Sequence, residues 1–411
     1  MKLKLYNFLR KLPVSSTLIG PPKGCNNDLK TYIDTYNCKH PKTPHQYWNL
    51  GSGEYTVPPP ENLKEASREA IVQTQIPYKN FVATLKKGRL LSMPYCVISN
   101  DDIVLYEVSD YLQVPPEKNP VFYFHKLPGV KKLKGKAVVL ATLYDDNNYA
   151  HWLTEILPKL YLLEKCGMRI QDFDHILMRY FRSPFVQEHL DYLGIPNEKI
   201  RMIDDRTSAE KDYSKRENTS PYWHIQADEL TVTNVIWRPE PWMPGFLQDL
   251  YLKENKGQVT PGKKLYIRRH NAKGRNLLNE AAVLDVLGRY GFEIIEAEKL
   301  SLLEKAGLFH EAEFIVAPHG AGMANIVFCQ PGTCVLELRA HGHSSIIIDE
   351  FRQLCAAGGL KYSLLLNEGV GEPEEINTGA NLDLKVDLTE FEETLKLFLT
   401  QCVSANQSMT R

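Results

Sequence analysis

The sequence predicts an α/β fold built from two doubly wound domains in series. Its 411 residues exceed what one ordinary hydrophobic core organises, so two domains are expected. In residues 136–203, and again in residues 264–366, short apolar runs alternate with helical patterns. This alternation is typical of a parallel sheet with helices on its faces. Ligands of such sheets bind beyond the carboxyl ends of the strands, so functional residues are expected there.

The amino-acid composition and net charge argue against several classes of function. Apolar residues make up 43% of the chain and charged residues 24%, as in an ordinary globular protein. The formal net charge of −1 offers no electrostatic case for binding nucleic acid, and no apolar run is long enough to span a bilayer. The eight cysteines are scattered without a C-x-x-C pair. This favours reduced thiols in a cytoplasmic protein over a disulfide framework or a zinc site.

Residues 1–240 are predicted to form the first domain. Residues 13–62 are rich in proline, glycine, asparagine and tyrosine, and we expect them to wrap over the domain as irregular structure. Residues 80–113 are expected to form a small antiparallel sheet. A Rossmann-like βαβαβ unit follows, with strands at 136–143, 175–179 and 199–203 and helices at 149–165 and 184–193.

Residues 241–411 are predicted to form a second Rossmann-like domain, whose last helix can cross back to the first domain. Its apolar runs and helical patterns again alternate, beginning after a connection rich in proline and charged residues. The strands are expected at 264–268, 292–296, 314–317, 334–338 and 361–366, and the helices at 279–290, 301–311, 344–356 and 388–400.

A glycine corner follows the strand predicted at Phe314–Ala317. The chain there reads Pro318–His319–Gly320–Ala321–Gly322, and a helical pattern starts directly after it. A helix N-terminus leaves N–H groups unpaired, and its dipole favours an anion. Gly320 and Gly322 would let a phosphate approach the backbone. Taken alone, the corner is equally compatible with a simple turn.

A basic cluster follows the first strand of the same domain and consists of Arg268, Arg269, Lys273 and Arg275. Guanidinium groups bind phosphate oxygens bidentately and stay charged, so they could hold a diphosphate without a metal. Taken alone, the cluster could equally be a solvated loop. Its place at a strand end in the same domain as the glycine corner favours an anion site.

A polar cluster opens the helix predicted at 149–165. Asn147 and Asn148 can cap its N-terminus, and His151 and Glu155 share a helix face because they are four residues apart. A carboxylate beside an imidazole orients the ring and raises its basicity, which suits a general base. Taken alone, a capped helix with a hydrogen-bonded histidine is the simpler interpretation. The spacing is not that of H-E-x-x-H, so no metal site is predicted.

Three stretches together resemble glycosyltransferase family 61, which includes bacterial capsular-polysaccharide enzymes and plant xylan-decorating enzymes. The resemblance runs from about Val121 to Leu366, and Arg269 matches the arginine of the second stretch better than Arg268 does. The stretches are NNYAHWLTEILPKL at 147–160, KLYIRRHNAKGRNLLNE at 264–280 and PHGAGMANIVFCQPGTCVLEL at 318–338.

The resemblance implies a GT-B arrangement, in which two Rossmann-like domains face each other across a cleft, and inverting chemistry that needs no metal or other cofactor. It implies His151 as the catalytic base on the acceptor side, steered by Glu155. It also implies a nucleotide-sugar donor, commonly a UDP-sugar, in the C-terminal domain. The donor-binding residues would be Arg269, Arg275, His319, Gly320, Ala321, Gly322, Met323, Asn325 and Glu337. Glu337 would bind a ribose hydroxyl.

The expected acceptor is a glycan or lipid-linked glycan of a cell-surface polysaccharide. The enzyme would then work in the cytoplasm, where the basic, amphipathic residues 1–14 either pack as a first helix or touch the inner face of the membrane. Two other functions fit the pattern: a polysaccharide pyruvyltransferase-like enzyme, and a non-catalytic carbohydrate-binding subunit of a biosynthetic complex. A dehydrogenase is disfavoured because the G-x-G-x-x-G fingerprint is missing.

Overall fold

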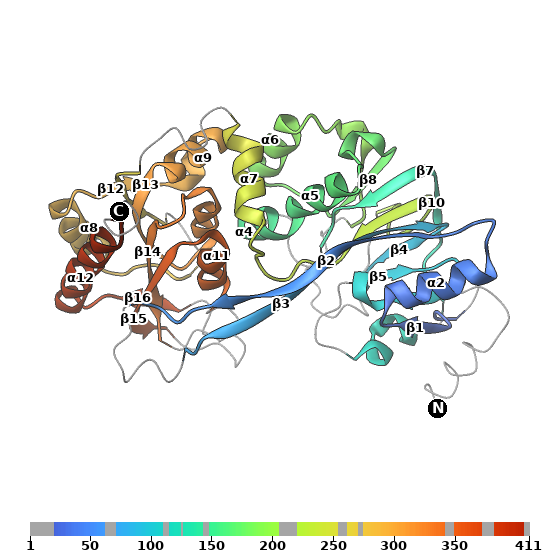
Figure 1. Ribbon diagram of the computed structural model, residues 1–411, viewed down its shortest axis with the longest axis horizontal. Coiled ribbons are helices and arrows are strands. Elements are labelled where there is room, and N and C mark those ends of the chain that lie inside the picture. Colours follow the sequence, from blue (N-terminus) through green and yellow to red (C-terminus); the bar gives the residue numbers. More distant parts are fainter. Residues whose placement is uncertain are drawn as a thin grey trace. The chain divides into compact units, whose positions relative to one another are not determined.

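The computed structural model describes residues 20–61, 71–109, 115–124, 126–142, 148–204, 220–253, 261–269, 274–341, 349–371 and 382–406. The predicted N-terminal helix, Asn147 and Lys273 lie outside these ranges. The chain forms two compact units (Figure 1). The first comprises Met1–Ser52 and Lys79–Trp237, and the second Gly53–Tyr78 and Arg238–Arg411.

The first unit contains the predicted βαβαβ arrangement. The strands β7 (Lys131–Val139), β8 (His175–Met178) and β9 (Ile200–Met202) are parallel neighbours, and β10 (His224–Thr233) runs parallel to β7 on its other side. The crossover from β7 to β8 carries α4 (Tyr149–His151), a π-helical segment η4 (Trp152–Ile156) and α5 (Pro158–Lys165). The crossover from β8 to β9 carries α6 (Pro184–Tyr192).

The predicted β region does not form a sheet of its own. Its strands β3 (Thr74–Lys86), β4 (Arg89–Ser92), β5 (Tyr95–Ile98) and β6 (Ile103–Leu105) extend the same sheet, because β10 pairs antiparallel with both β3 and β4. The described sheet has ten strands, and its main path is β1-β6-β5-β4-β10-β7-β8-β9. A single core cluster spans both the antiparallel and the parallel strands.

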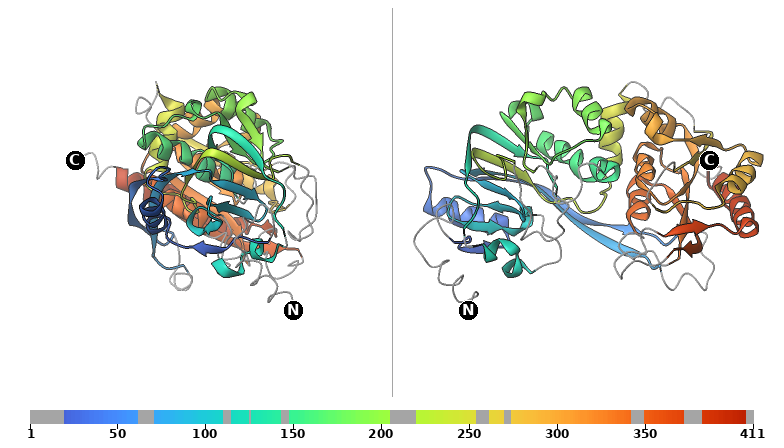
Figure 2. Two further views of the ribbon diagram at one scale, coloured as in Figure 1. Left: turned by 90° about the vertical axis from the view of Figure 1, so that its right-hand side faces the viewer. Right: turned by 180° about the vertical axis from the view of Figure 1, so that it is seen from behind.

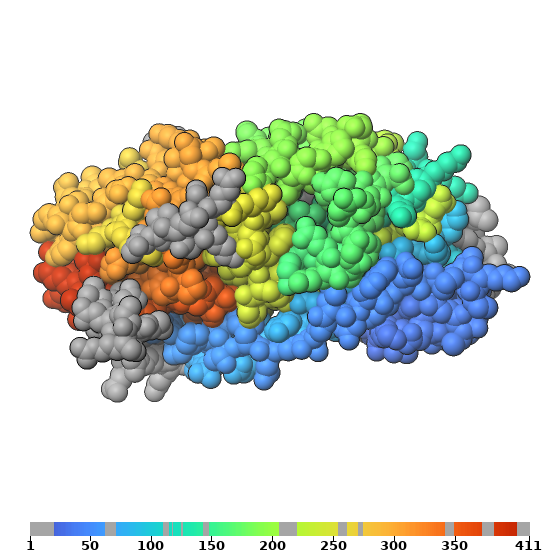
Figure 3. Space-filling model, turned by 45° about the horizontal axis from the view of Figure 1, so that its top comes forward, coloured from blue at the N-terminus to red at the C-terminus, as the bar shows by residue number. Residues whose placement is uncertain are grey.

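The expectation of irregular structure in residues 13–62 is wrong for most of the described part. A helix, α2 (Leu29–Lys39), begins at Asp28, whose side chain accepts a hydrogen bond from the Thr31 amide at 3.0 Å. Leu29, Tyr32, Ile33 and Tyr36 form its buried face. The strands β1 (Gly24–Asn26) and β2 (Gln46–Val57) flank it. Strand β2 is largely exposed, and its atoms (blue) lie on the face shown in Figure 3.

Residues 53–78 belong to the second unit although the sequence predicts a boundary near residue 240. Strands β2 and β3 pair with each other, as the views in Figure 2 show. The segment that joins them is fixed by the buried Arg352, whose Nη1 donates to the carbonyls of Pro58 at 3.0 Å and Val72 at 3.1 Å. The Glu61 amide also donates to the carbonyl of Tyr362 at 2.9 Å.

The second unit is doubly wound around a six-stranded sheet of order β12-β11-β13-β14-β15-β16. All pairings are parallel except that of β15 with β16. The strands are β11 (Lys263–Ile267), β12 (Glu293–Ile295), β13 (Ala312–Pro318), β14 (Cys334–Ala340), β15 (Lys361–Val370) and β16 (Asp383–Lys385). The first five strands have the order 2-1-3-4-5, which reverses direction between β11 and β13.

The described helices of the second unit form two groups. Helix α8 (Glu280–Arg289) and the last helix, α12 (Leu388–Asn406), pack together, and α12 also contacts β14 and β15. In the described part of the chain, the last helix therefore packs against elements of the second unit. The other group is α7 (Met243–Leu252), α9 (Leu302–His310), the 3₁₀ helix η8 (Ala321–Phe328) and α11 (Glu350–Gly358).

The composition led to expectations about the cysteines and about membrane-spanning segments. Six cysteines among the described residues are free thiols, but Cys334 is disulfide-bonded, so the prediction of reduced thiols throughout is wrong. Within the described ranges, no helix is both long enough and apolar enough to cross a membrane.

Candidate functional site

The glycine corner lies at the carboxyl edge of the second sheet, between β13 and η8. Gly320 precedes the first turn of η8, and its carbonyl accepts a hydrogen bond from the Met323 amide at 2.9 Å. The helix predicted after the corner is therefore present, but it is a 3₁₀ helix of eight residues. Its first amides precede this hydrogen bond and are available to a ligand.

A cavity of about 300 Å³ opens at this corner. It lies at the point between β11 and β13 where the strand order reverses, which is the usual ligand position in a doubly wound sheet. Its described lining residues come from the ends of β11, β12 and β13 and from the start of η8. They are Ile267, Arg268, Arg269, Ala297, Glu298, Pro318, Gly320, Ala321, Gly322 and Met323.

Arg269 reaches across this edge to the glycine corner. Its Nη1 donates to the carbonyl of His319 at 2.7 Å, and its Nη2 donates to the carbonyl of Gly274 at 3.2 Å. Its Nε is buried and has no partner among the described residues. Burial and the charge of Arg275 lower the pKa of Arg269 to about 10, so the guanidinium is still positive at neutral pH.

Arg275 is the second cation at this edge. Its backbone is left-handed, with φ at 61°, a conformation that is uncommon for residues other than glycine and often found at functional sites. Its Nε is buried without a partner among the described residues. Burial lowers its pKa, and the charges of Glu350 and Glu337 partly oppose this. Two guanidinium groups with unpaired buried N–H donors form a site suited to an anion.

Arg268 has a different environment although it is adjacent in sequence. Its Nε donates to the Glu280 carboxylate at 2.9 Å, and the Tyr266 hydroxyl donates to the same carboxylate at 3.0 Å. Arg268 therefore has a protein counter-charge, whereas Arg269 binds only carbonyl groups among the described residues. This arrangement supports Arg269 as the anion ligand.

The glycine at position 320 is required by Arg269. A Cβ on Gly320 would lie 1.6 Å from Nη1 of Arg269, whereas a Cβ on Gly322 would lie 3.2 Å from Cγ2 of Ile267. We expect Gly320→Ala to displace Arg269 and to weaken binding of UDP, the nucleotide implied by the family resemblance, by about 10-fold or more. Gly288→Ala is the matched control, because Gly288 lies on α8 outside the described cavity lining and a Cβ there would meet nothing within 4 Å. Calorimetric titration of both folded variants measures the difference, and equal affinities would contradict this role of Gly320.

His319 is part of the glycine corner but not of the described cavity lining. The ring is buried beside Phe351, with centroids 5.1 Å apart, and its Nδ1 lies 2.5 Å from Oε1 of Glu337. Glu337 also accepts hydrogen bonds from Arg339 at 2.8 Å and from the Tyr362 hydroxyl at 2.5 Å. The network holds the imidazole in one orientation next to the carbonyl that Arg269 binds.

Glu337 and Asn325, two further predicted donor ligands, are buried and bind other groups of the protein. The Glu337 side chain has no exposed area and binds three other side chains, so the expected contact with ribose has no support from this geometry. Asn325 is also fully buried, and its Nδ2 donates to the carbonyl of Gly322 at 2.9 Å. Asn325 therefore stabilises the corner. The sequence could not show this, because burial depends on what packs over each strand and helix.

The lowered pKa of Glu337 predicts that the free energy of unfolding decreases at acidic pH. Burial alone would raise this pKa, but the charges of Arg339 and His319, together with hydrogen bonds, outweigh burial and lower the pKa from 4.5 to about 2. The stabilisation is therefore fully present above pH 4.5 and is lost as the pH falls toward 2. It amounts to about 3 kcal/mol.

Urea unfolding between about pH 5 and pH 2.5 tests this prediction. Glu337→Gln should be less stable than the wild type at neutral pH and should lose less stability on acidification. Its matched control is Glu293→Gln, since Glu293 is exposed on β12 of the same unit. The same pH dependence in the wild type and Glu337→Gln would contradict the prediction.

The predicted His151–Glu155 pair forms in the first unit. Nδ1 of His151 lies 2.5 Å from Oε1 of Glu155, and the two side chains are 25% and 10% exposed. Asn148 caps the helix, since its side chain accepts a hydrogen bond from the Ala150 amide at 3.0 Å. A carboxylate on Nδ1 directs the other ring nitrogen, Nε2, toward the role of proton acceptor.

The helix that carries this pair is π-helical over Trp152–Ile156, which the sequence analysis does not predict. The Leu157 amide donates to the Trp152 carbonyl, five residues back, at 3.0 Å. Pro158 follows directly and has no N–H to offer to a regular helical ladder, which gives a local reason for the wider turn. Such π-helical turns are frequent at functional sites.

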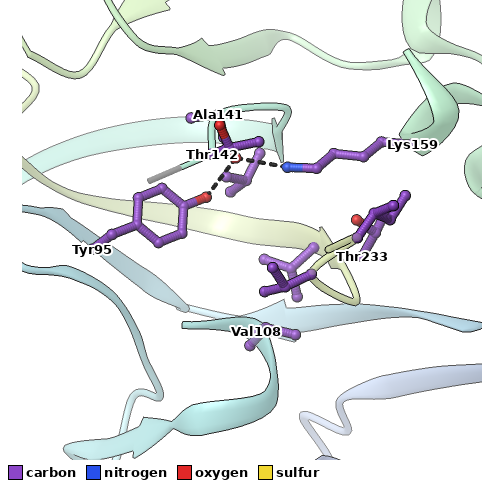
Figure 4. A pocket seen from close by; sticks show the side chains of 10 residues that line it. Tyr95, Val108, Ala141, Thr142, Lys159 and Thr233 are labelled. Atoms are coloured by element: carbon purple, nitrogen blue, oxygen red, sulfur yellow. Dashed lines mark hydrogen bonds between the residues drawn. The ribbon is translucent and has the colours of Figure 1, made fainter. Parts of the chain in front are cut away.

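Lys159, at the end of the same stretch, is a buried charged residue that sequence reasoning missed. Its Nζ donates to the carbonyl of Leu140 at 3.0 Å. Figure 4 shows its second bond, to the carbonyl of Ala141 at 2.6 Å, and the bond that the Tyr95 hydroxyl donates to the same carbonyl at 2.9 Å. Lys159 therefore ties α5 to the carboxyl end of β7. The available signal was a lysine at an apolar position of an amphipathic helix.

Metal ligands do not gather in the described part of the chain, where no group of three or more His, Cys, Asp or Glu side chains could hold an ion. The Asp172–Phe173–Asp174 sequence lies before β8. Asp172 pairs with Arg169 at 3.0 Å, and Asp174 accepts a hydrogen bond from the Lys136 amide at 2.8 Å.

The central part of the chain matches the model of a known protein family. The model of a family described as Glycosyltransferase 61 matches residues 149–336. The matched region begins two residues before His151 and ends at the residue before Glu337, so it includes the histidine–glutamate pair, the described arginines and the glycine corner. No curated protein matches the chain.

Proposed function

We propose that this protein, whose residues 149–336 match glycosyltransferase family 61, moves a sugar from a nucleotide-sugar donor, a UDP-sugar, to a glycan or lipid-linked glycan. The observation that carries the proposal is the anion site in the second unit. Arg269 and Arg275 each bring a buried Nε–H without a partner among the described residues to the edge of the sheet at which the glycine corner opens into a cavity.

The donor diphosphate would bind at this edge. A phosphate is matched by the guanidinium fork of Arg269 and by the first amides of η8, and Gly320 and Gly322 leave room for it to approach. As the bond from the anomeric carbon to the diphosphate oxygen breaks, negative charge grows on the leaving group. Fixed cations and N–H dipoles stabilise that charge more than they stabilise the ground state, which lowers the barrier.

The acceptor hydroxyl must lose a proton as it attacks the anomeric carbon. We propose His151 as the base, with Nε2 taking the proton while Glu155 stabilises the imidazolium through Nδ1. One displacement of this kind inverts the anomeric configuration. The proposal requires a GT-B arrangement, in which the first unit presents His151 to a donor held by the second.

The proposal also makes the reaction independent of a metal, since the arginines would supply the positive charge. Purified protein is incubated with a panel of nucleotide sugars and candidate glycans, with and without EDTA. Transfer or donor hydrolysis that persists in EDTA, with inverted configuration in the product, is the expected result. Loss of activity in EDTA would contradict metal independence, and absence of any nucleotide-sugar turnover or binding would contradict the function itself.

The cellular compartment in which the reaction takes place is a separate question. A role in cell-surface polysaccharide assembly would put the enzyme in the cytoplasm, at the inner face of the membrane. The disulfide at Cys334 points instead to an oxidising compartment, because cytoplasmic thiols are normally kept reduced. Alkylation of free thiols in intact cells, followed by mass spectrometry of the Cys334 peptide, separates the two: a labelled Cys334 supports the cytoplasm, and a protected one contradicts it.

A further inference from the structure

Among the described residues that line the cavity in the second unit, one, Glu298, is a carboxylate, whereas the arginines and the glycine corner suit an anion. Glu298 belongs to the short 3₁₀ helix Ala297–Lys299, which follows β12, and β12 is the parallel neighbour of β11. Glu298 and Arg269 line the same cavity, and the charge of Glu298 raises the pKa of Arg269 against the effect of burial. The carboxylate is therefore close enough to act on the same ligand.

Glu298 is available to a ligand, whereas the neighbouring Glu296 is not. Within the described part of the chain, Glu298 forms no hydrogen bond or ion pair, and its residue is exposed. Glu296 instead pairs with Lys299 at 2.7 Å. The carboxylate of Glu337 was the predicted ligand of the ribose. It is instead hydrogen-bonded to His319, Arg339 and Tyr362.

A carboxylate in an anion site needs a chemical reason, because it repels phosphate. It becomes favourable toward the ligand when the ligand also carries hydrogen-bond donors, and two vicinal hydroxyls can donate to the two oxygens of a carboxylate. A nucleoside diphosphate has both parts, since its ribose diol lies next to the phosphates. In doubly wound domains an acidic residue that follows the second strand commonly binds ribose hydroxyls. Glu298 follows β12, the second strand of this sheet in chain order.

We propose that Glu298 binds the ribose hydroxyls of the donor nucleotide and makes the site selective for ribonucleotides. This inference rests on the proposed function, because it assumes that the cavity takes a nucleoside diphosphate. The apolar residues Ile267, Ala297 and Met323 line the same cavity and supply surface for the sugar ring or base. The cavity, at about 300 Å³, is near the lower end of ligand-site volumes.

Calorimetric titration with UDP, 2′-deoxy-UDP and 3′-deoxy-UDP tests the inference. The wild type should bind UDP about 10-fold more tightly than at least one deoxy analogue, because a site built to bind a hydroxyl rejects a ligand that lacks it. Glu298→Ala should weaken UDP binding by a similar factor and should bind that analogue as the wild type does. Glu298→Gln, which keeps one acceptor oxygen, should be intermediate.

Glu293→Ala is the matched control, since Glu293 is an exposed carboxylate on β12 and does not belong to the described cavity lining. It should keep the full preference for UDP. The inference is overturned if Glu298→Ala weakens UDP and both analogues equally, or changes none of them. Failure of the proposed function looks different: the wild type would not bind UDP at all, or Arg269→Ala would bind it as well as the wild type.

Discussion

Arg269→Ala should weaken binding of UDP by about 100-fold, since hydrogen bonds to charged groups contribute about 1.5–3 kcal/mol each. The variant removes a guanidinium whose Nη1 is held by the His319 carbonyl at 2.7 Å and whose Nε is buried without a described partner. Turnover should fall further than affinity, because negative charge on the leaving diphosphate is greater in the transition state than in the bound donor.

Two further variants separate charge from geometry. Arg269→Lys keeps the positive charge but not the planar fork, so it should recover only part of the affinity. Arg289→Ala is the control, because Arg289 is 59% exposed and pairs with Glu392 on the surface of the same unit. Calorimetry with UDP and initial rates with the active donor measure both effects. Unchanged UDP affinity in a folded Arg269→Ala variant would exclude Arg269 as a diphosphate ligand.

His151→Ala should lower kcat by about 100- to 10,000-fold while leaving the affinity for UDP nearly unchanged. The reason is that a general base acts on the acceptor hydroxyl and contributes nothing to holding the nucleotide. Glu155→Gln should lower kcat less, because it keeps a hydrogen-bonding group beside Nδ1 of His151 but removes the negative charge that stabilises the imidazolium.

His40→Ala is a suitable control, since His40 is an exposed histidine at the end of α2 in the same unit. Single-turnover rates at saturating donor, together with UDP titrations, distinguish the possible roles. A His151→Ala variant that keeps its turnover at saturating donor but binds UDP weakly would assign His151 to the donor site and leave the base unidentified.

Local sequence patterns were enough for the elements that carry the candidate site. The alternation of apolar runs and helical patterns predicted β7, β8 and β9 of the first unit and β11 to β15 of the second, because burial on both faces of a parallel strand leaves a short continuous apolar run. The capping role of Asn148 and the contact of His151 with Glu155 also follow from local spacing.

Local sequence patterns did not predict which distant segments of the chain contact each other. Strand β2 is largely exposed and has no clear alternation, so its own residues do not indicate that it pairs with β3. The same holds for residues 53–78, which join the second unit because Arg352 binds the carbonyls of Pro58 and Val72. A residue 280 or more positions away leaves no trace in a local window.

The fold class, the glycine corner and the candidate residues can be predicted from the sequence alone, because each depends on residue type and short spacing. These candidates are Arg269, Arg275, His151 and Glu155. The environments of Glu337 and Glu298, in contrast, become known only from the folded chain. Glu337 is enclosed by Arg339, Tyr362 and His319, whereas Glu298 faces the cavity, although Glu337 lies within β14 and Glu298 follows β12 of the same sheet. The physical reason is that burial and counter-charge depend on the neighbouring strands and helices, which a linear pattern does not contain.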